Sequence, residues 1–173
     1  FESKPGLGTK FFFTVRFRNA AAPESLVDHP VSDSKTKFPD SAVSLRILCA
    51  ENNSIIREHL NYFLSIAGHE VVAVENGQDV LKILRKSHFD LILMDIQMPV
   101  MDGLETTKVI RTSKGPEFDP HIPIIALTPC VTKENREEML QAGMDDFISK
   151  PIDIDKLEQR ISRISALKSC SRN

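Results

Sequence analysis

The stretch DLILMDIQMPVMDG, residues 90–103, decides the fold of this chain. After Asp90 it has four successive apolar residues, then the polar Asp95, and further on Pro99 and Gly103. Apolar residues at successive positions are typical of a strand that is buried on both faces of a parallel sheet. We therefore expect a central strand over Asp90–Met94, followed by a polar loop.

Four further runs of the same kind predict four more strands: Arg46–Ala50, Glu70–Val74, Pro123–Leu127 and Asp146–Ser149. Helical patterns separate them, such as the apolar spacing from Ile56 to Ala67, which Gly68 should end. Strands that alternate with helices through short connections favour a parallel sheet covered on both sides. The predicted fold class is α/β, a three-layer α/β/α sandwich around a five-stranded parallel sheet.

Composition narrows the function classes. The 173 residues hold 22 Lys and Arg and 24 Asp and Glu, so neither nucleic acid nor a charged tail is indicated. The apolar runs are far shorter than the ~20 residues of a membrane helix, and no secretory leader opens the sequence. Three scattered cysteines, Cys49, Cys130 and Cys170, favour reduced thiols. We expect a cytoplasmic location and no membrane contact from this chain, leaving open whether a parent protein is membrane-anchored.

Polar residues follow four of the predicted strands. They are Glu51-Asn52, Asp95, Thr128 and Lys150. Ligands of open parallel sheets bind at the carboxyl ends of the strands. Oxygen ligands suit Mg²⁺, a hydroxyl and an ammonium suit phosphoryl oxygens, and Asp95 suits a nucleophile that forms an acyl phosphate.

Each of these residues also has a purely structural interpretation. Asn52 or Asn53 could only cap a helix, Thr128 could be a turn residue, and Lys150 a solvated charge. For one residue alone the structural interpretation is favoured about three to one. The coincidence of all four at the ends of different strands favours a site.

Three segments together carry a resemblance to a known family. They are DLILMDIQMPVMDG (90–103), IIALT (124–128) and FISKP (147–151). In combination they resemble the receiver domain of two-component response regulators, over about residues 45–168. The resemblance implies a flavodoxin-like fold with strand order 2-1-3-4-5.

The resemblance also implies a phosphorylation site. Asp95 would accept a phosphoryl group from a phosphohistidine. Glu51, Asn52, Asp95 and the backbone carbonyl of Gln97 would hold Mg²⁺. Gln97 and Cys130 occupy the positions at which the family tunes the lifetime of the phosphorylated state.

Further positions are implied to respond to phosphorylation. Thr128 would hydrogen-bond the phosphoryl group and Lys150 would pair with it. Phe147 stands at the aromatic switch position of the family, and the Lys150–Pro151 peptide bond would be cis. The result would be a changed protein-interaction surface.

Two residues depart from the pattern of the family. Asn52 replaces a carboxylate by a neutral amide, so Mg²⁺ should bind more weakly and Asp95 should ionise more easily. Pro129 follows Thr128 where a small residue usually donates its N–H to the phosphoryl group. A charge-assisted hydrogen bond of roughly 1.5–3 kcal/mol would then be missing.

The opening segment ESKPGLGTKFFFT, residues 2–14, resembles the end of a histidine-kinase ATP-binding domain. This implies a hybrid histidine kinase in which 1–18 is a remnant of that domain, 19–43 a flexible linker, 44–168 the receiver and 169–173 a tail. The implied partners are a histidine-kinase dimerisation domain or a histidine phosphotransfer protein. The chain itself would be a phosphoacceptor, with self-phosphorylation and autodephosphorylation at most.

Three other function classes compete with this one. A pseudo-receiver would use the fold as a constitutive interaction module, and Asn52 with Pro129 would mark its degenerate site. A haloacid dehalogenase-type phosphohydrolase needs a second Asp where Gln97 stands. A Rossmann nucleotide binder needs glycines where Glu51 and its neighbours stand. The phosphoacceptor is favoured over the pseudo-receiver by about two to one.

Overall fold

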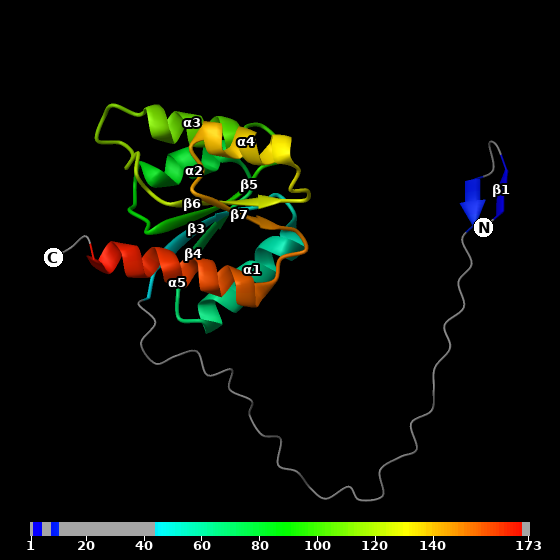
Figure 1. Ribbon diagram of the computed structural model, residues 1–173, viewed down its shortest axis with the longest axis horizontal. Coiled ribbons are helices and arrows are strands. Elements are labelled where there is room, and N and C mark those ends of the chain that lie inside the picture. Colours follow the sequence, from blue (N-terminus) through cyan, green and yellow to red (C-terminus); the bar gives the residue numbers. More distant parts are fainter. Residues whose placement is uncertain (1, 5–7, 11–43, 171–173) are drawn as a thin grey trace, which may run out of the picture. The chain divides into compact units, whose positions relative to one another are not determined.

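The computed structural model describes residues 2–4, 8–10 and 44–170. Contacts divide the chain into two units, Phe1–Thr36 and Lys37–Asn173 (Figure 1). Each unit is therefore described by itself.

The first unit contains a short antiparallel pair of strands. β1 (Glu2–Lys4) pairs with β2 (Gly8–Lys10), with Ser3 opposite Thr9. The predicted strand over Phe11–Phe17 and the predicted linker lie outside the described residues.

The second unit is built on a five-stranded parallel sheet. Its strands are β3 (Arg46–Ala50), β4 (Glu70–Val74), β5 (Leu91–Asp95), β6 (Ile124–Thr128) and β7 (Asp146–Ser149). They lie in the order β4-β3-β5-β6-β7, and every neighbouring pair is parallel. Counted from β3, this is the expected order 2-1-3-4-5, so the predicted sheet is confirmed.

Two strands begin and end one residue later than predicted. Pro123 has no N–H with which to donate to a neighbouring strand, so β6 begins at Ile124. At the other end, Asp95 still pairs with Leu127, and Thr128 pairs with Ser149. The ladder therefore fixes the backbones of both predicted site residues.

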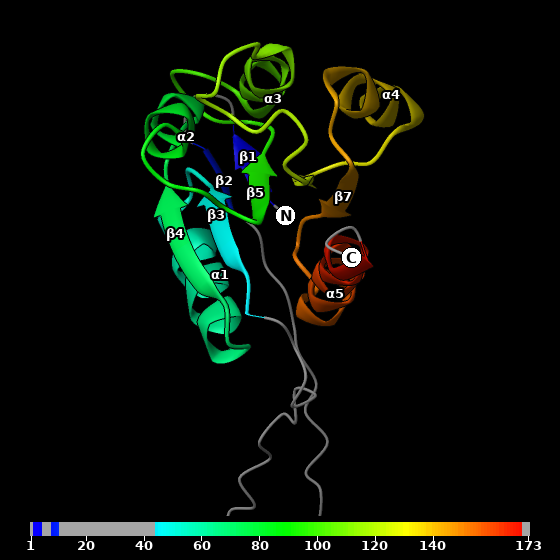
Figure 2. The same cartoon turned by 90° about the vertical axis from the view of Figure 1, so that its left-hand side faces the viewer.

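Five helices cover the two faces of the sheet. They are α1 (Ser54–Ile66), α2 (Gly77–Leu84), α3 (Gly103–Thr112), α4 (Lys133–Ala142) and α5 (Ile154–Cys170). α1 and α5 lie on one face, and α2, α3 and α4 on the other (Figures 1 and 2). The predicted three-layer sandwich is confirmed.

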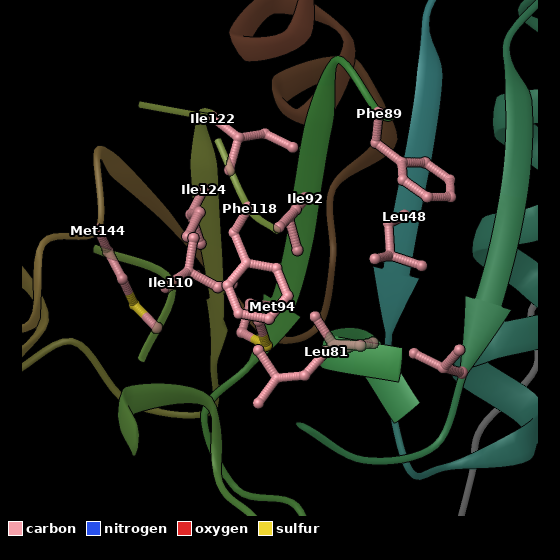
Figure 3. Close-up of a cluster of buried hydrophobic side chains, with 14 of the residues drawn as sticks. Leu48, Leu81, Phe89, Ile92, Met94, Ile110, Phe118, Ile122, Ile124 and Met144 are labelled. Carbon is pink, nitrogen blue, oxygen red and sulfur yellow. The ribbon is translucent and has the colours of Figure 1, made fainter. Parts of the chain in front are cut away.

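The sheet separates two apolar cores, because alternate residues of each strand point to opposite faces. On β3, Leu48 and Ala50 join the core under α2, α3 and α4, part of which is shown in Figure 3. Ile47 and Cys49 join the core under α1 and α5. Burial raises the pKa of the Cys49 thiol to about 12, so this cysteine stays protonated and acts as a packing residue.

The loop after β3 is set by local capping. Asn53 caps α1, and its side-chain oxygen accepts from the N–H groups of Ile55 and Ile56 at 3.0 and 3.2 Å. α1 closes at Ala67, and Gly68 follows at φ +93°, a conformation that favours glycine. The capping interpretation thus holds for Asn53, while Asn52 lies in the loop before the helix.

Candidate functional site

The predicted polar residues meet at the carboxyl ends of neighbouring strands. Asp95 and Thr128 are the last residues of β5 and β6, while Glu51 and Lys150 directly follow β3 and β7. Glu51, Asp95 and Thr128 are each at most 2% exposed. The Lys150 N–H also donates to the Thr128 carbonyl at 2.7 Å, which ties the ends of β6 and β7 together.

The Lys150 ammonium bridges the two carboxylates. Its Nζ lies 2.7 Å from Oε2 of Glu51 and 2.9 Å from Oδ2 of Asp95. With both carboxyl groups ionised, the three side chains carry a net charge of −1 in a buried place. One ammonium only partly compensates two buried carboxylates, so the site attracts further positive charge.

The pKa values of Glu51 and Lys150 reflect two opposing effects, burial and the attraction between the ammonium and the carboxylates. Burial raises the pKa of the Glu51 carboxyl, against the opposing effect of Lys150 and of the Asn53 N–H, which donates to Oε1 at 3.0 Å. For Lys150, burial lowers the pKa of the ammonium, but the two carboxylates outweigh burial and the net shift is upward. Lys150 is therefore held in its charged form.

The donor set fits a hard cation such as Mg²⁺. Oε2 of Glu51 contacts the Lys150 ammonium at 2.7 Å and has no other donor among the described residues, so it keeps a lone pair for a cation. Within the described ranges, no three His, Cys, Asp or Glu side chains form a metal-holding group. Asn52 is exposed and offers an oxygen without a charge.

The Thr128 hydroxyl is engaged inside its own loop. It donates to the Cys130 carbonyl at 2.9 Å and accepts from the Cys130 N–H at 3.3 Å. The Asn135 side-chain amide donates to the same carbonyl at 3.3 Å. To reach a phosphoryl group on Asp95, the Thr128 hydroxyl would have to exchange these partners.

The remaining predicted residues lie on β7 and in the loops that follow β5, β6 and β7. Gln97 is exposed, and its N–H donates to Oδ1 of Asp95 at 3.3 Å. Phe147 is half-buried on β7, with the Arg136 guanidinium 5.8 Å above its ring. Pro129 and Cys130 are exposed in the loop after β6, and the Lys150–Pro151 bond is cis, as expected.

Sequence reasoning missed Arg57, which holds the loop that carries Asn52. Its Nη1 donates to the carbonyls of Glu51 and Asn52 at 2.8 and 3.3 Å. The signal in the sequence is a basic residue in the first turn of a helix, where the helix dipole disfavours positive charge.

A family model described as the response regulator receiver domain matches residues 47–162. The chain belongs to this family. The receiver resembles the sensor protein GacS of Pseudomonas syringae pv. syringae, with 36% identity over 129 residues, 75% of this chain and 14% of GacS. It also resembles hybrid signal transduction histidine kinase K of Dictyostelium discoideum, with 37% identity over 128 residues, 72% of this chain and 10% of that kinase. The chain thus spans a small part of the length of these curated relatives.

Solved structures of receivers match with similar coverage. The receiver domain of the sensor histidine kinase PA1611 of Pseudomonas aeruginosa, which has magnesium in its active site cleft, is 32% identical, with a TM-score of 0.64 over 71% of this chain and 99% of that domain. The receiver of Saccharomyces cerevisiae Ssk1, crystallised with the histidine phosphotransfer protein Ypd1, is 28% identical, with a TM-score of 0.65 over 72% of this chain and 91% of that one. This chain is therefore a receiver domain of two-component signalling. In the part of the receiver that the structure describes, no helix is both long and apolar enough to span a membrane.

Proposed function

We propose that this receiver accepts a phosphoryl group on Asp95 from a phosphohistidine in an Mg²⁺-dependent reaction. The observation that carries the proposal is the buried cluster of Glu51, Asp95 and Lys150, with 2.7 and 2.9 Å between the ammonium and the two carboxylates. A constitutive interaction module has no need of a buried, undercompensated carboxylate pair, which opposes folding. The cluster therefore favours retained chemistry over a pseudo-receiver.

Each residue has a defined part in the transfer. A carboxylate oxygen of Asp95 attacks phosphorus, an O–P bond forms, and the P–N bond to the donor imidazole breaks, with the electron pair passing to the nitrogen. Lys150 neutralises charge on the phosphoryl oxygens, and Thr128 donates a hydrogen bond to them. Mg²⁺ would be held by Glu51, Asn52, Asp95 and the Gln97 carbonyl. Because Asn52 is neutral, the ion would bind more weakly than in a site with a carboxylate at this position. When bound, Mg²⁺ supplies further positive charge to the phosphoryl oxygens.

The phosphorylation test uses acetyl phosphate as the donor. With Mg²⁺, the intact mass of the wild-type chain should rise by one phosphoryl group, and this gain should disappear in Asp95→Asn or without the metal. Asp155→Asn, an exposed aspartate in the first turn of α5, is the matched control and should gain the group normally. No gain, together with no amide shift on adding beryllofluoride, would contradict the proposal and leave the pseudo-receiver.

An apolar groove beside the site suits a protein donor. It has a volume of about 250 Å³ and is lined by Ile55, His59, Pro151 and Ile152, and also by Lys150 of the site. Ile55 is 76% exposed, so its burial by a partner would be favourable. We propose that the histidine-bearing helix of a phosphotransfer protein or of a kinase dimerisation domain docks here, next to Asp95.

The chain is further proposed to come from a hybrid histidine kinase. Its relatives GacS and kinase K are much longer than this chain. The antiparallel pairing of β1 with β2 is consistent with a remnant of an ATP-binding domain over 1–18. A linker over 19–43, the receiver over 44–168 and a tail over 169–173 would follow it. Phosphorylation would change the surface around Phe147 and hence the contact with a partner.

Pro129 is expected to weaken the phosphorylated state. Pro129→Ala would restore an N–H next to Thr128, which can donate to a phosphoryl oxygen. In an amide NMR titration with Mg²⁺ present, we expect the half-saturating beryllofluoride concentration to fall about tenfold. Pro120→Ala, in the loop that precedes β6 and so at the opposite end of this strand from Thr128, should leave it unchanged. Equal affinities of Pro129→Ala and wild type would show that the proline only stiffens the loop.

A further inference from the structure

Arg57 stands in an unfavourable place for a cation. It lies in the first turn of α1, where the N–H groups of the helix already produce positive potential. Yet its side chain is only 17% exposed. A guanidinium withdrawn from solvent at a helix N-terminus requires specific partners.

Those partners belong to two loops at the site. Nη1 donates to the Glu51 carbonyl at 2.8 Å and to the Asn52 carbonyl at 3.3 Å. Nη2 pairs with Oε1 of Glu75 at 2.7 Å. Glu75 directly follows β4, the neighbour of β3, so the guanidinium fastens the loop after β3 to the loop after β4.

We propose that Arg57 is a positioning residue for the binding of a divalent cation. This proposal rests on the function proposed above. By holding the carbonyls on both sides of the Asn52 α-carbon, it fixes the backbone from which the neutral Asn52 oxygen is presented. An amide attracts a cation less strongly than a carboxylate does. The contribution of the Asn52 oxygen to cation affinity therefore depends more on this oxygen being in position before the cation binds. This clamp, formed by the Arg57 guanidinium and the carbonyls of Glu51 and Asn52, thereby offsets part of the cation affinity that is lost with the carboxylate at position 52.

Electrostatics alone predicts the opposite sign. Removing the Arg57 charge leaves Glu75 unpaired and makes the surroundings of the site more negative, which would strengthen binding of Mg²⁺. Removing the clamp frees the backbone of Glu51 and Asn52, which must then be ordered when the cation binds. The direction of the change in affinity therefore distinguishes a positioning role from a charge effect.

The test compares Arg57→Gln with Arg46→Gln in amide NMR titrations with Mg²⁺ alone. Arg46 is the matched control, because it pairs with Glu70 at 2.9 Å across the same two strands, at their opposite ends. We expect Arg57→Gln to weaken Mg²⁺ binding about tenfold and Arg46→Gln to leave it unchanged. Arg57→Lys keeps the charge but loses the fork of donors, so it should weaken binding in the same direction. Unchanged or tighter binding in Arg57→Gln would overturn the proposal.

A measurement without metal separates this inference from the proposed function. In metal-free protein, amide hydrogen exchange of residues 51–53 should be about tenfold faster in Arg57→Gln than in wild type. If wild type binds no Mg²⁺, the proposed function fails, while the exchange still tests the clamp. Should Arg57→Gln not fold, Glu75→Gln, which removes only the ion pair, replaces it and should speed the same exchange about threefold. Unchanged exchange at 51–53 in the folded variant would refute the clamp.

Discussion

Replacing Lys150 by glutamine is expected to lower the free energy of unfolding by about 3–5 kcal/mol at neutral pH without divalent cations. The ammonium is the counter-ion of two carboxylates whose side chains are 0% and 3% exposed. Glutamine leaves both charges buried with no cation beside them. This is among the most unfavourable single changes that the site allows.

The pH dependence follows from Glu51. Burial raises the pKa of this carboxyl, and Lys150 opposes the rise. A raised pKa means that the folded state binds this proton more tightly than the unfolded state, so the contribution of Glu51 to stability is fully present below its unfolded pKa and is lost as the pH rises through its folded pKa. Without Lys150 the pKa of Glu51 rises further, and the loss of stability should shrink as the pH falls toward the ordinary value of 4.5.

Above neutral pH, the stability difference between wild type and Lys150→Gln depends on the charge of Lys150. The pKa of Lys150 lies above its ordinary value of 10.5, so its contribution is present below that value and is lost only as the pH passes the raised pKa. The difference between wild type and Lys150→Gln should therefore persist from neutral pH to about pH 10. Mg²⁺ should restore part of the stability of the variant, because a cation bound to the folded state takes over the compensation.

Urea unfolding followed by circular dichroism measures these effects. Lys156→Gln is the matched control, since its ammonium pairs with Asp153 at 3.2 Å with both side chains largely exposed. An exposed pair contributes at most about 1 kcal/mol, so this variant should unfold almost as wild type does. The explanation would be wrong if Lys150→Gln and Lys156→Gln were equally stable.

Gly103→Ala should destabilise the receiver by about 3 kcal/mol or more, because it forces a collision with the backbone of Asp95. A Cβ at position 103 would lie 2.2 Å from the Asp95 carbonyl oxygen and 2.9 Å from Cγ of Met94. The Gly103 N–H donates to the Ile96 carbonyl at 3.0 Å, so the start of α3 is tied to the loop after Asp95. Relief of the collision would displace the phosphoacceptor itself.

Two measurements check this second prediction. Urea unfolding should show the loss of stability, and amide NMR should show shifts at Asp95 and its neighbours. Gly115→Ala is the control, because nothing lies within 4 Å of its Cβ position and its φ is not positive. It should leave stability unchanged or slightly higher. Wild-type stability in Gly103→Ala would mean that α3 can move away from Asp95 at little cost.

Local sequence patterns were sufficient to predict much of this fold. Buried parallel strands read as continuous apolar runs, and amphipathic helices repeat with their own period, so the α/β/α sandwich follows from residue spacing. The cap at Asn53 and the end of α1 just before Gly68 are equally local. The ends of β5 and β6 could not be placed to the residue, because pairing between strands, not local sequence, carries the ladder on to Asp95 and Thr128.

The receiver motifs likewise placed Glu51, Asp95, Thr128 and Lys150 at one edge of the sheet. They could not show that the Thr128 hydroxyl is bonded to Cys130, because that depends on the course of the loop after β6.

Long side chains that join remote segments were beyond the sequence. Arg111 shows this, since its guanidinium donates to the carbonyls of Pro120, Ile122 and Gly143 and pairs with Asp145. From the helix pattern alone, Arg111 is predicted only to be a basic residue in the last turn of α3. Its four partners come from segments 9 to 34 residues away in the sequence.

By itself, then, the sequence determined the layers, the strand order through its family motifs, and the set of polar residues at the strand ends, because apolar periodicity and strand direction are properties of short segments. Only the tertiary structure decided that one ammonium is shared by Glu51 and Asp95, and that Arg57 joins the two loops beside them. Those contacts depend on the reach of flexible side chains between strands that are neighbours in space and distant in sequence, and no local pattern encodes that reach.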